Sequence, residues 1–324
     1  MYIWLGLFTS LALLLAVYTT ASLVAGLAWR RLDRVSQGWD ARRRADFLFA
    51  GRIAPAAIAI CFVVFIAWPA FLAFEPRHSN ETIGLKLSIM AALAACGIAW
   101  SFHRVAQAWS DSRRVTSEWM RRAQPASIHG VAIPIYRLDH PFPIMAVSGI
   151  FRPRLFIANH LLDSMQPAEI AAAVAHEMGH VAARDNLRRV LLRLCPDLTG
   201  NRDARWMEAS ENAADLFAVR RGTRAALDLA SALVKVARAT PAGMTMAFPP
   251  YLQLLAADSE SGLAGRVQRL VELSEQETSL EQPSGVRTLA VAVPLTCALI
   301  AYWTSPAALH AAHDLLERFV RMFS

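Results

Sequence analysis

The chain has 324 residues, of which 55% are hydrophobic, and its formal net charge is +7. The hydrophobic share exceeds that of an ordinary soluble enzyme and is concentrated in a few long uncharged runs, which indicates a membrane protein. The positive charge is almost all arginine and lies beside the apolar runs, where membrane topology would place it. We therefore expect no direct binding of nucleic acid.

Four segments are long and apolar enough to cross a bilayer. Residues 3–28, 53–74 and 288–309 are uncharged, and residues 83–102 contain one charge, Lys86, near an end where its ammonium can reach the membrane surface. A helix that spans the hydrocarbon needs roughly 20 apolar residues. The sequence therefore predicts about four transmembrane helices. For residues 288–309 the alternative is a buried helix of the soluble part.

The arginines predict the orientation of these spans. Residues 29–52 contain seven arginines and residues 103–122 contain five, whereas the stretch between the second and third spans has only Arg77. Because basic residues accumulate on the cytoplasmic side, residues 29–52 and the large segment after residue 103 should be cytoplasmic. Both termini should then be extracytoplasmic, in a multi-pass protein of the bacterial inner membrane.

Four regions follow from this layout. Only the second is long enough to build a soluble core. They are residues 1–102, with three transmembrane helices and the basic cytoplasmic loop 29–52; residues 103–287, the cytoplasmic domain; residues 288–309, the fourth transmembrane helix; and residues 310–324, a short extracytoplasmic tail.

Within the cytoplasmic domain the pattern predicts mainly helices with a small sheet. Residues 144–147 and 155–158 flank a turn rich in Gly, Pro and Arg, which is typical of a β-hairpin. Pro167 suits the first turn of a helix that should run to about Leu194. The other elements expected are a helix over 104–122, an edge strand over 131–138, and helices over about 203–221, 223–239 and 262–274.

The most informative motif lies in the middle of the helix expected from Pro167: His176-Glu177-Met178-Gly179-His180. Positions i and i+4 share one face of a helix, so both imidazoles can bind one metal ion. Glu177 lies beside them, where it can act as general base on a water molecule. The four cysteines show no paired spacing, so a metal site must depend on His, Glu and Asp side chains.

A catalytic zinc ion usually has three protein ligands and one open position. We expect Glu211 to be the third ligand, because Glu211-Asn212-Ala213-Ala214-Asp215 places a glutamate and an aspartate on one helix face. Asp215 would accept a hydrogen bond from a ligand imidazole. Glu208 is the alternative ligand. Asp185, five residues after His180 on one continuous helix, would be turned about 140° away.

Gly179 is a poor residue for the middle of a helix, where it costs roughly 1 kcal/mol relative to alanine. Close approach of another backbone to the metal helix would explain it.

Together, the HEMGH motif, the following Arg184-Asp185, the ENAAD motif and the Gly-x-x-x-Pro-Arg turn at residues 149–154 resemble the BlaR/MecR-type membrane zinc metallopeptidases. The HtpX-type and CAAX-prenyl endoproteases are related but usually have a longer gap between HExxH and ExxxD. The resemblance implies a zincin-like α+β domain of the gluzincin type. It also implies zinc bound by His176, His180 and Glu211, with Glu177 catalytic.

The best-known members of this family cleave a repressor, or themselves, after a signal from outside. The present chain continues for only 15 residues after its fourth predicted span. We therefore expect a separate sensor partner, or the membrane itself, to provide any signal.

The sequence thus predicts a membrane-embedded, zinc-dependent endopeptidase that cleaves a protein or peptide at the cytoplasmic face, with regulated proteolysis of a repressor as one signalling role. The strand at residues 144–147 could pair with an extended substrate. Two alternatives remain: a membrane-protein quality-control protease of the HtpX type, and a non-catalytic zinc-binding sensor or scaffold. For the group that stabilises the substrate carbonyl oxygen, the candidates are Tyr136, His160 and Arg221.

Overall fold

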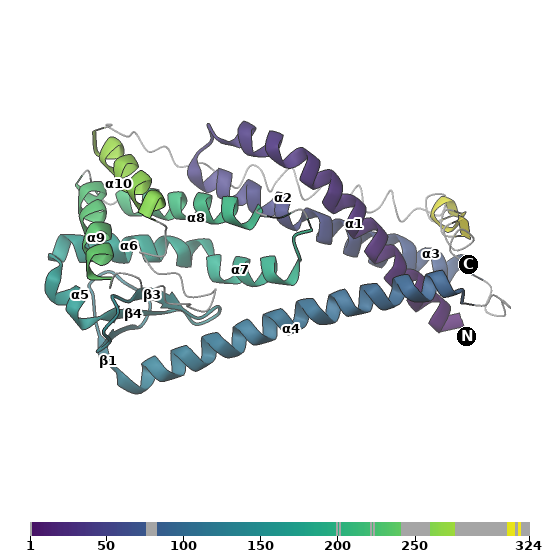
Figure 1. Ribbon diagram of the computed structural model, residues 1–324, viewed down its shortest axis with the longest axis horizontal. Helices are drawn as coiled ribbons and strands as arrows, with labels where there is room; N and C mark the ends of the chain where they lie inside the picture. Colours follow the sequence, from purple (N-terminus) through teal and green to yellow (C-terminus); the bar gives the residue numbers. More distant parts are fainter. Residues whose placement is uncertain are drawn as a thin grey trace.

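The computed structural model describes residues 2–75, 83–198, 200, 202–220, 222, 224–240, 260–275, 310–314 and 317–318. The molecule has a long, narrow helical bundle at one end and a broader domain at the other (Figure 1). The bundle is built from four α-helices and one π-helical turn: α1 (Tyr2–Ser36), α2 (Ala41–Phe62), η1 (Val63–Ala67), α3 (Trp68–Phe74) and α4 (Leu85–Arg122).

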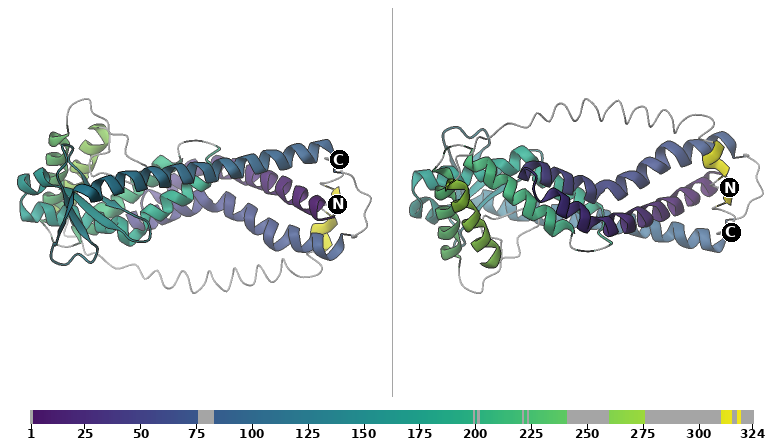
Figure 2. Two further views of the ribbon diagram at one scale, coloured as in Figure 1. Left: turned by 90° about the horizontal axis from the view of Figure 1, so that it is seen from below. Right: turned by 90° about the horizontal axis from the view of Figure 1, so that it is seen from above.

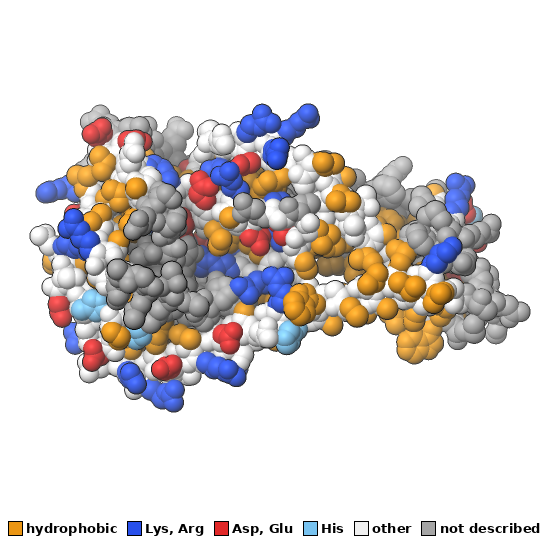
Figure 3. Space-filling view, viewed as in Figure 1, with side chains coloured by type: hydrophobic (Ala, Val, Ile, Leu, Met, Phe, Trp, Pro, Cys, Tyr) orange, Lys and Arg blue, Asp and Glu red, His pale blue; other side chains and the backbone are white. Residues whose placement is uncertain are grey.

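Three continuous helical segments of the bundle are long and apolar enough to cross a membrane: Tyr2–Ser36, Ala41–Phe74 and Leu85–Arg122. The first two contain the predicted spans 3–28 and 53–74, and the third begins at Leu85, two residues into the predicted span 83–102. They indicate a multi-pass membrane protein. Side chains such as Leu27 and Leu85 are 85% and 76% exposed, as contact with lipid would require. Figure 3 shows hydrophobic side chains gathered along the narrow part. The fourth predicted span, residues 288–309, lies outside the described residues.

The basic region predicted as a loop over residues 29–52 is mostly helical. Helix α1 continues to Ser36 and α2 begins at Ala41, so only a short turn joins them. Asp40 caps α2 by accepting hydrogen bonds from the backbone N–H groups of Arg42 and Arg43. Arginine is a good helix former, so both helices extend beyond the apolar runs. The arginine-rich composition of this region therefore did not reveal that it is helical.

The broader domain contains a four-stranded mixed sheet in the order β1-β2-β4-β3. The predicted hairpin forms β3 and β4, which pair antiparallel, and β3 lies at the edge of the sheet. Gly149 begins the turn at φ +102°, and a Cβ there would lie 2.5 Å from the carbonyl oxygen of Arg152. The strands are β1 (Ala123–Ala126), β2 (Ile135–Leu138), β3 (Met145–Ser148) and β4 (Arg154–Ala158).

Two of these strands differ from expectation. The strand predicted over residues 131–138 is shorter, because only β2 pairs with its neighbours. Strand β1, which continues directly from α4, was not predicted; its sequence Ala-Gln-Pro-Ala carries no β-strand pattern. It pairs with β2 only, at the edge of the sheet, where a proline is tolerated.

Six helices pack around the sheet, and α6 is the central one. Its segment Ala172–Ala175 is buried between the sheet residues Met145 and Phe156 and the apolar face of α9, which includes Leu229 and Leu233. The six helices are α5 (Asn159–Ser164), α6 (Pro167–Ala183), α7 (Asp185–Leu194), α8 (Arg202–Val219), α9 (Ala225–Ala239) and α10 (Glu260–Glu275).

The first turn of α6 is fixed by a buried carboxylate. Glu169 accepts a hydrogen bond from the backbone N–H of Gln166 at 2.7 Å, which completes a capping box, and Pro167 occupies the first turn. Lys235 and Ser231 of α9 each place a donor 2.6 Å from the same carboxylate. Helix α6 therefore begins at a defined position relative to α9.

The single helix predicted from Pro167 to Leu194 is wrong. Arg184 adopts a left-handed conformation, φ 54° and ψ 39°, which ends α6 at Ala183, and α7 begins at Asp185. A non-glycine residue rarely adopts this conformation. The direction of a side chain after Arg184 therefore cannot be calculated from His180 by counting helical turns.

Ionic contacts attach the domain to the bundle. Arg52 of α2 is buried, with its Nε 2.7 Å from Oδ1 of Asp203 and its Nη2 2.7 Å from the carbonyl oxygen of Cys195. In the same cluster Arg202 pairs with Asp197 at 2.6 Å. These contacts connect α2 to the segment between α7 and α8. Together with the unbroken α4, they hold the two parts in a fixed arrangement (Figure 2).

A short helical segment, residues 310–314, lies at the opposite end of the bundle from the domain. The rings of His310 and His313 lie 5.0 and 5.6 Å from that of Phe74, and Ala312 packs against the cluster formed by Leu13 and its neighbours. Residues 275 and 310 thus lie at opposite ends of the molecule.

Candidate metal centre

Three buried side chains converge from two helices. His176 and His180 lie one turn apart on α6, and Glu211 faces them from α8. The Nε2 atoms of the two histidines are 3.2 Å apart, and they lie 3.5 and 3.4 Å from the two carboxylate oxygens of Glu211. Tetrahedral coordination with bonds of about 2.0–2.1 Å places ligand atoms roughly 3.3 Å apart. The three side chains therefore fit one zinc ion.

Close packing of α6 on α8 brings Glu211 to the histidines. At Gly179, a Cβ would lie 3.0 Å from the Cα of Ala214 and 3.2 Å from the Cβ of Phe217. This confirms that a second backbone approaches the metal helix at its glycine. Ala214 is three residues from Glu211, so the separation of the two helices at Gly179 sets the reach of the Glu211 carboxylate.

A carboxylate also contacts the second nitrogen of each histidine. Oδ1 of Asp215 lies 2.9 Å from Nδ1 of His176, in the place predicted for it. Oδ2 of Asp185 lies 2.8 Å from Nδ1 of His180, although helical counting turned Asp185 away. The left-handed Arg184 redirects the chain and brings Asp185 back to the site. Such contacts orient a ligand imidazole and fix which nitrogen faces the metal.

Arg266 of α10 completes the outer side of the site. Its guanidinium lies 2.7 Å from Oδ1 of Asp215 and 3.2 Å from Oε2 of Glu211, and the arginine is 4% exposed. It therefore holds both carboxylates of the ENAAD motif in place. No local pattern predicts this role, because Arg266 lies 51 residues beyond Asp215.

Burial and charge act against each other in this cluster. Burial alone would lower the pKa of His176, but Asp215 and Glu211 outweigh it and raise that pKa to about 9. Burial would raise the pKa of Glu211 and Asp215, but the histidines and Arg266 lower both. The carboxylates are thus ionised at neutral pH, and they surround the histidines with negative charge that favours a cation.

Glu177 lies between the two histidines in sequence and is 3% exposed. Burial raises the pKa of its carboxyl group above the usual value, while His176 and His180 act in the opposite direction. A raised pKa makes the carboxylate a stronger base than an ordinary glutamate, which suits a general base that takes a proton and later returns it.

Among the residues that the structure describes, the other candidates from the sequence take no part in this cluster. Glu208, the alternative ligand, is exposed and pairs with Arg205 of its own helix at 3.2 Å. Tyr136 stacks on Phe156 in the sheet. His160 lies in the first turn of α5, with a buried Nε2. Arg221 lies outside the described residues.

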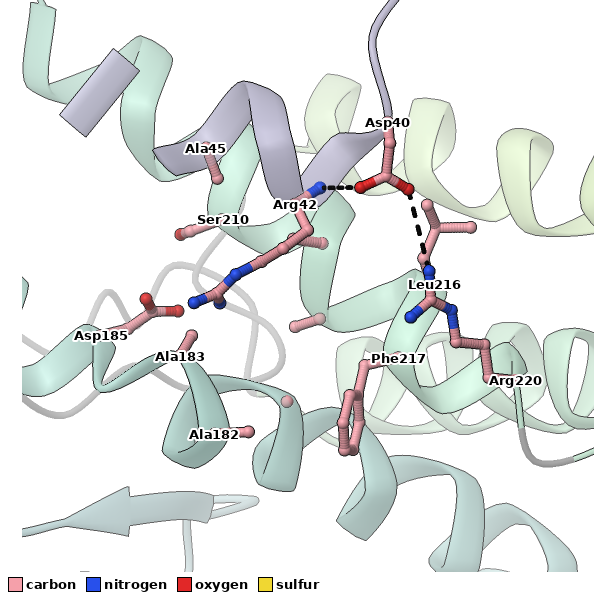
Figure 4. Close-up of a pocket in the computed structure, with 13 residues that line it drawn as sticks. Asp40, Arg42, Ala45, Ala182, Ala183, Asp185, Ser210, Leu216, Phe217 and Arg220 are labelled. Atoms are coloured by element: carbon pink, nitrogen blue, oxygen red, sulfur yellow. Dashed lines mark hydrogen bonds and ion pairs between the residues drawn. The ribbon is translucent and has the colours of Figure 1, made fainter. Parts of the chain in front are cut away.

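A cavity of about 270 Å³ lies next to the end of the metal helix (Figure 4). It is lined by residues of α2, α6 and α8 and by Asp185, but by neither histidine nor Glu211. The Arg42 side chain points toward Asp185 in this cavity, and Asp40 pairs with Arg220 at 3.8 Å. The cavity lies between the α1–α2 turn and the metal helix. A substrate bound in it would not contact the two histidines.

Residues 144–199 match the model of Peptidase family M48. No curated protein matches the chain. The matched segment runs from β3 through α7 and contains the HExxH motif, and the structure adds Glu211 from beyond it. Over these residues the chain is therefore similar to the M48 peptidases. It is a zinc metalloendopeptidase, and its substrate is a protein or peptide. The BlaR/MecR-type resemblance stays a prediction.

Replacing Gly179 by alanine should weaken zinc binding at least about tenfold, since displaced groups around a metal site typically cost 10–100-fold in affinity. The new Cβ would push α8, and with it Glu211, away from the histidines by a few tenths of an ångström. Competition with a zinc-chelating indicator measures the affinity. Gly265→Ala on α10 is the control, because a Cβ there meets nothing within 4 Å. Equal affinities in the two variants would contradict this packing argument.

Proposed function

We propose that this protein is a membrane-anchored zinc endopeptidase that cleaves a protein substrate at the cytoplasmic face of the bacterial inner membrane. The observation that carries the proposal is the convergence of His176, His180 and Glu211 within zinc-binding distance, on a domain attached directly to three candidate transmembrane helices. The match to Peptidase family M48 supports the peptidase chemistry.

In this proposal His176, His180 and Glu211 would hold the zinc ion, while Asp215 and Asp185 orient the two imidazoles. Once bound, zinc would supply a Lewis acid for activation of water and of the scissile carbonyl group. Glu177 takes the proton from the attacking water and then delivers it to the nitrogen of the leaving peptide. Burial of the site keeps competing water away from that proton transfer.

The edge strand β3 supplies a binding surface for an extended substrate. In the β3–β4 ladder Ile144, Ala146 and Ser148 face β4, so the N–H and C=O groups of Val147 point outward. The carbonyl oxygen of Val147 lies 3.4 Å from the amide nitrogen of Asn186, a long contact that a pairing peptide would replace. A peptide that pairs here as a further strand would lie beside α6, the helix that carries the two histidines.

Two biological roles fit this chemistry. Regulated proteolysis of a repressor, driven by a separate sensor partner, follows from the BlaR/MecR-type resemblance. Quality control of membrane proteins is the second candidate, and the match of residues 144–199 to Peptidase family M48 favours it. Comparison of the proteins that accumulate in cells carrying the wild-type chain or a Glu177 variant would separate the two roles.

The orientation is part of the proposal, and the domain should be reached from the cytoplasm. Glu208 is exposed on the domain surface, so Glu208→Cys offers a label site outside the metal centre. A membrane-impermeant maleimide should label this variant, above the wild-type background, in inverted membrane vesicles and not in right-side-out ones. Labelling from the outer side alone would reverse the orientation inferred from the arginines.

Replacing Glu177 by alanine should abolish turnover, because general acid–base catalysis typically contributes 10²–10⁴-fold. The zinc content should not change, since the metal contacts of His176, His180 and Glu211 are retained. Cleavage of fluorescein-labelled casein and metal analysis of the purified protein measure the two quantities. Glu208→Ala, which removes an exposed carboxylate on α8, should leave both unchanged.

Persistent cleavage by the Glu177→Ala variant would refute the assigned base. If that variant loses cleavage but its cellular phenotype equals that of the wild type, the scaffold alternative gains support.

Val147→Pro removes the one outward N–H of residue 147 and keeps the ladder between β3 and β4, because proline is tolerated on the open side of an edge strand. We expect kcat/KM for a peptide substrate to fall by about tenfold, as loss of one backbone hydrogen bond in a buried cleft would cause. Zinc content should stay constant. Val147→Ala, which keeps the N–H, is the control, and loss of zinc in the proline variant would count against strand pairing.

A further inference from the structure

Arg189 is a second buried cation beside the metal centre, and the mechanism above does not use it. It lies on α7 four residues after Asp185, so the two side chains share one face of that helix. Asp185 contacts His180 at 2.8 Å, and this face of α7 is therefore turned toward the metal helix. Arg189 is 7% exposed, which is unusual for an arginine.

The contacts of Arg189 leave a donor group unused. Its Nη1 lies 3.4 Å from Oδ1 of Asn186, at the limit of a hydrogen bond. Its Nη2 is buried and has no hydrogen-bond acceptor in the part of the chain that the structure describes. A buried donor without an acceptor destabilises the folded state, so an arginine in this position indicates that an acceptor arrives from elsewhere.

Asn186 shows from which direction that acceptor comes. While its Oδ1 faces Arg189, its Nδ2 donates to the carbonyl oxygens of Gly149 at 3.0 Å and Val147 at 3.4 Å. The pair Asn186–Arg189 thus lies beside the end of the edge strand β3, on the same helix as Asp185, which contacts His180. A peptide that pairs with β3 would pass this pair close to the histidines.

The charges around Arg189 match this position. Burial lowers the pKa of its guanidinium, whereas Glu211, Asp185 and Glu177 act in the opposite direction, so all three carboxylates lie within its electrostatic reach. Glu177 in turn is influenced by Arg189 together with His176 and His180. Arg189 is therefore coupled electrostatically to the general base, and Asn186 connects it to the edge strand.

We propose that Nη2 of Arg189 donates a hydrogen bond to the carbonyl oxygen of the scissile peptide bond and stabilises the negative charge that develops there. This inference rests on the proposed endopeptidase function and assigns the oxyanion donor of the same site. A fixed, charged donor in a buried site needs little rearrangement during the reaction, which is the condition under which such groups accelerate acyl transfer most.

The alternative is a purely structural role, in which Arg189 only balances the charge of Asp185 and Glu211. The two roles differ in what they predict. A structural arginine acts through the metal site, so its loss should reduce zinc binding or folding. A donor to the substrate acts on the transition state, so its loss should reduce kcat and the binding of a transition-state analogue while zinc stays bound.

The test compares Arg189→Met with Arg188→Met, which removes the neighbouring arginine of the same helix. Arg188 pairs with Asp46 of α2 at 2.6 Å and lies away from the metal centre. The substrate is a quenched fluorescent peptide built on a casein cleavage site, and the probe for the transition state is a phosphinic peptide of the same sequence, whose tetrahedral anion resembles the reacting carbonyl. Zinc content is measured in every variant.

For Arg189→Met we expect kcat to fall about 100-fold, as loss of one oxyanion donor does, with KM changed less than about threefold. Affinity for the phosphinic peptide, measured by calorimetry without turnover, should fall by about the same factor. Zinc content should equal that of the wild type. Arg188→Met should change kcat less than about fivefold, since partly exposed ion pairs contribute little.

Arg189→Lys is a second variant, which keeps the test informative if Arg189→Met fails to fold. Lysine keeps the charge but offers a point donor in place of the planar fork, so it should recover part of the lost kcat and retain zinc. Equal kcat losses in the Arg188 and Arg189 variants, unchanged phosphinic-peptide binding in Arg189→Met, or loss of zinc in Arg189→Lys would each overturn the assignment. Failure of the proposed function is distinguishable, because the wild-type protein would then show no cleavage that depends on Glu177.

Discussion

The contact between α6 and α8 at Gly179 is the constraint on which the active centre depends. Two histidines one turn apart on a helix can bind a metal without help from the rest of the fold. Glu211, 31 residues after His180, reaches the same point only if the backbones of α6 and α8 nearly touch. The absence of a side chain at Gly179 permits that distance, and Ala214 opposite it keeps the interface small. The helix penalty of a glycine is therefore offset by assembly of the site.

The approach of these helices concentrates charge, and the rest of the centre balances it. Two buried guanidinium groups, from Arg189 and Arg266, face an excess of buried carboxylates. The four carboxylates are those of Glu177, Asp185, Glu211 and Asp215. With neutral imidazoles, two negative charges remain, which one divalent cation neutralises. The raised pKa of His176, about 9, has the same cause, because a proton on His176 offsets part of this negative charge when no cation is bound.

Local patterns predicted the parts of this site that depend on helical spacing. The histidine pair, Glu177 and the ENAAD face each lie within one or two turns of a helix, and the β-hairpin was visible from its turn residues. Asp185 was misplaced because a single left-handed residue, Arg184, breaks the periodicity that the argument used. Arg189 and Arg266 gave no signal, since burial of an arginine depends on how α7 and α10 pack, and no spacing rule records that.

The attachment of the domain to the bundle limits which substrates can reach the centre. Helix α4 continues for 20 residues beyond the predicted end of its span at residue 102, a length of about 30 Å. The ion pairs of Arg52 with Asp203 and Asp197 prevent the domain from swinging away on that helix. An extended chain rises about 3.3 Å per residue. A substrate anchored in the same membrane therefore needs on the order of ten extended residues outside the bilayer to cover that length. This geometry favours substrates that offer a flexible tail or an unfolded segment outside the bilayer.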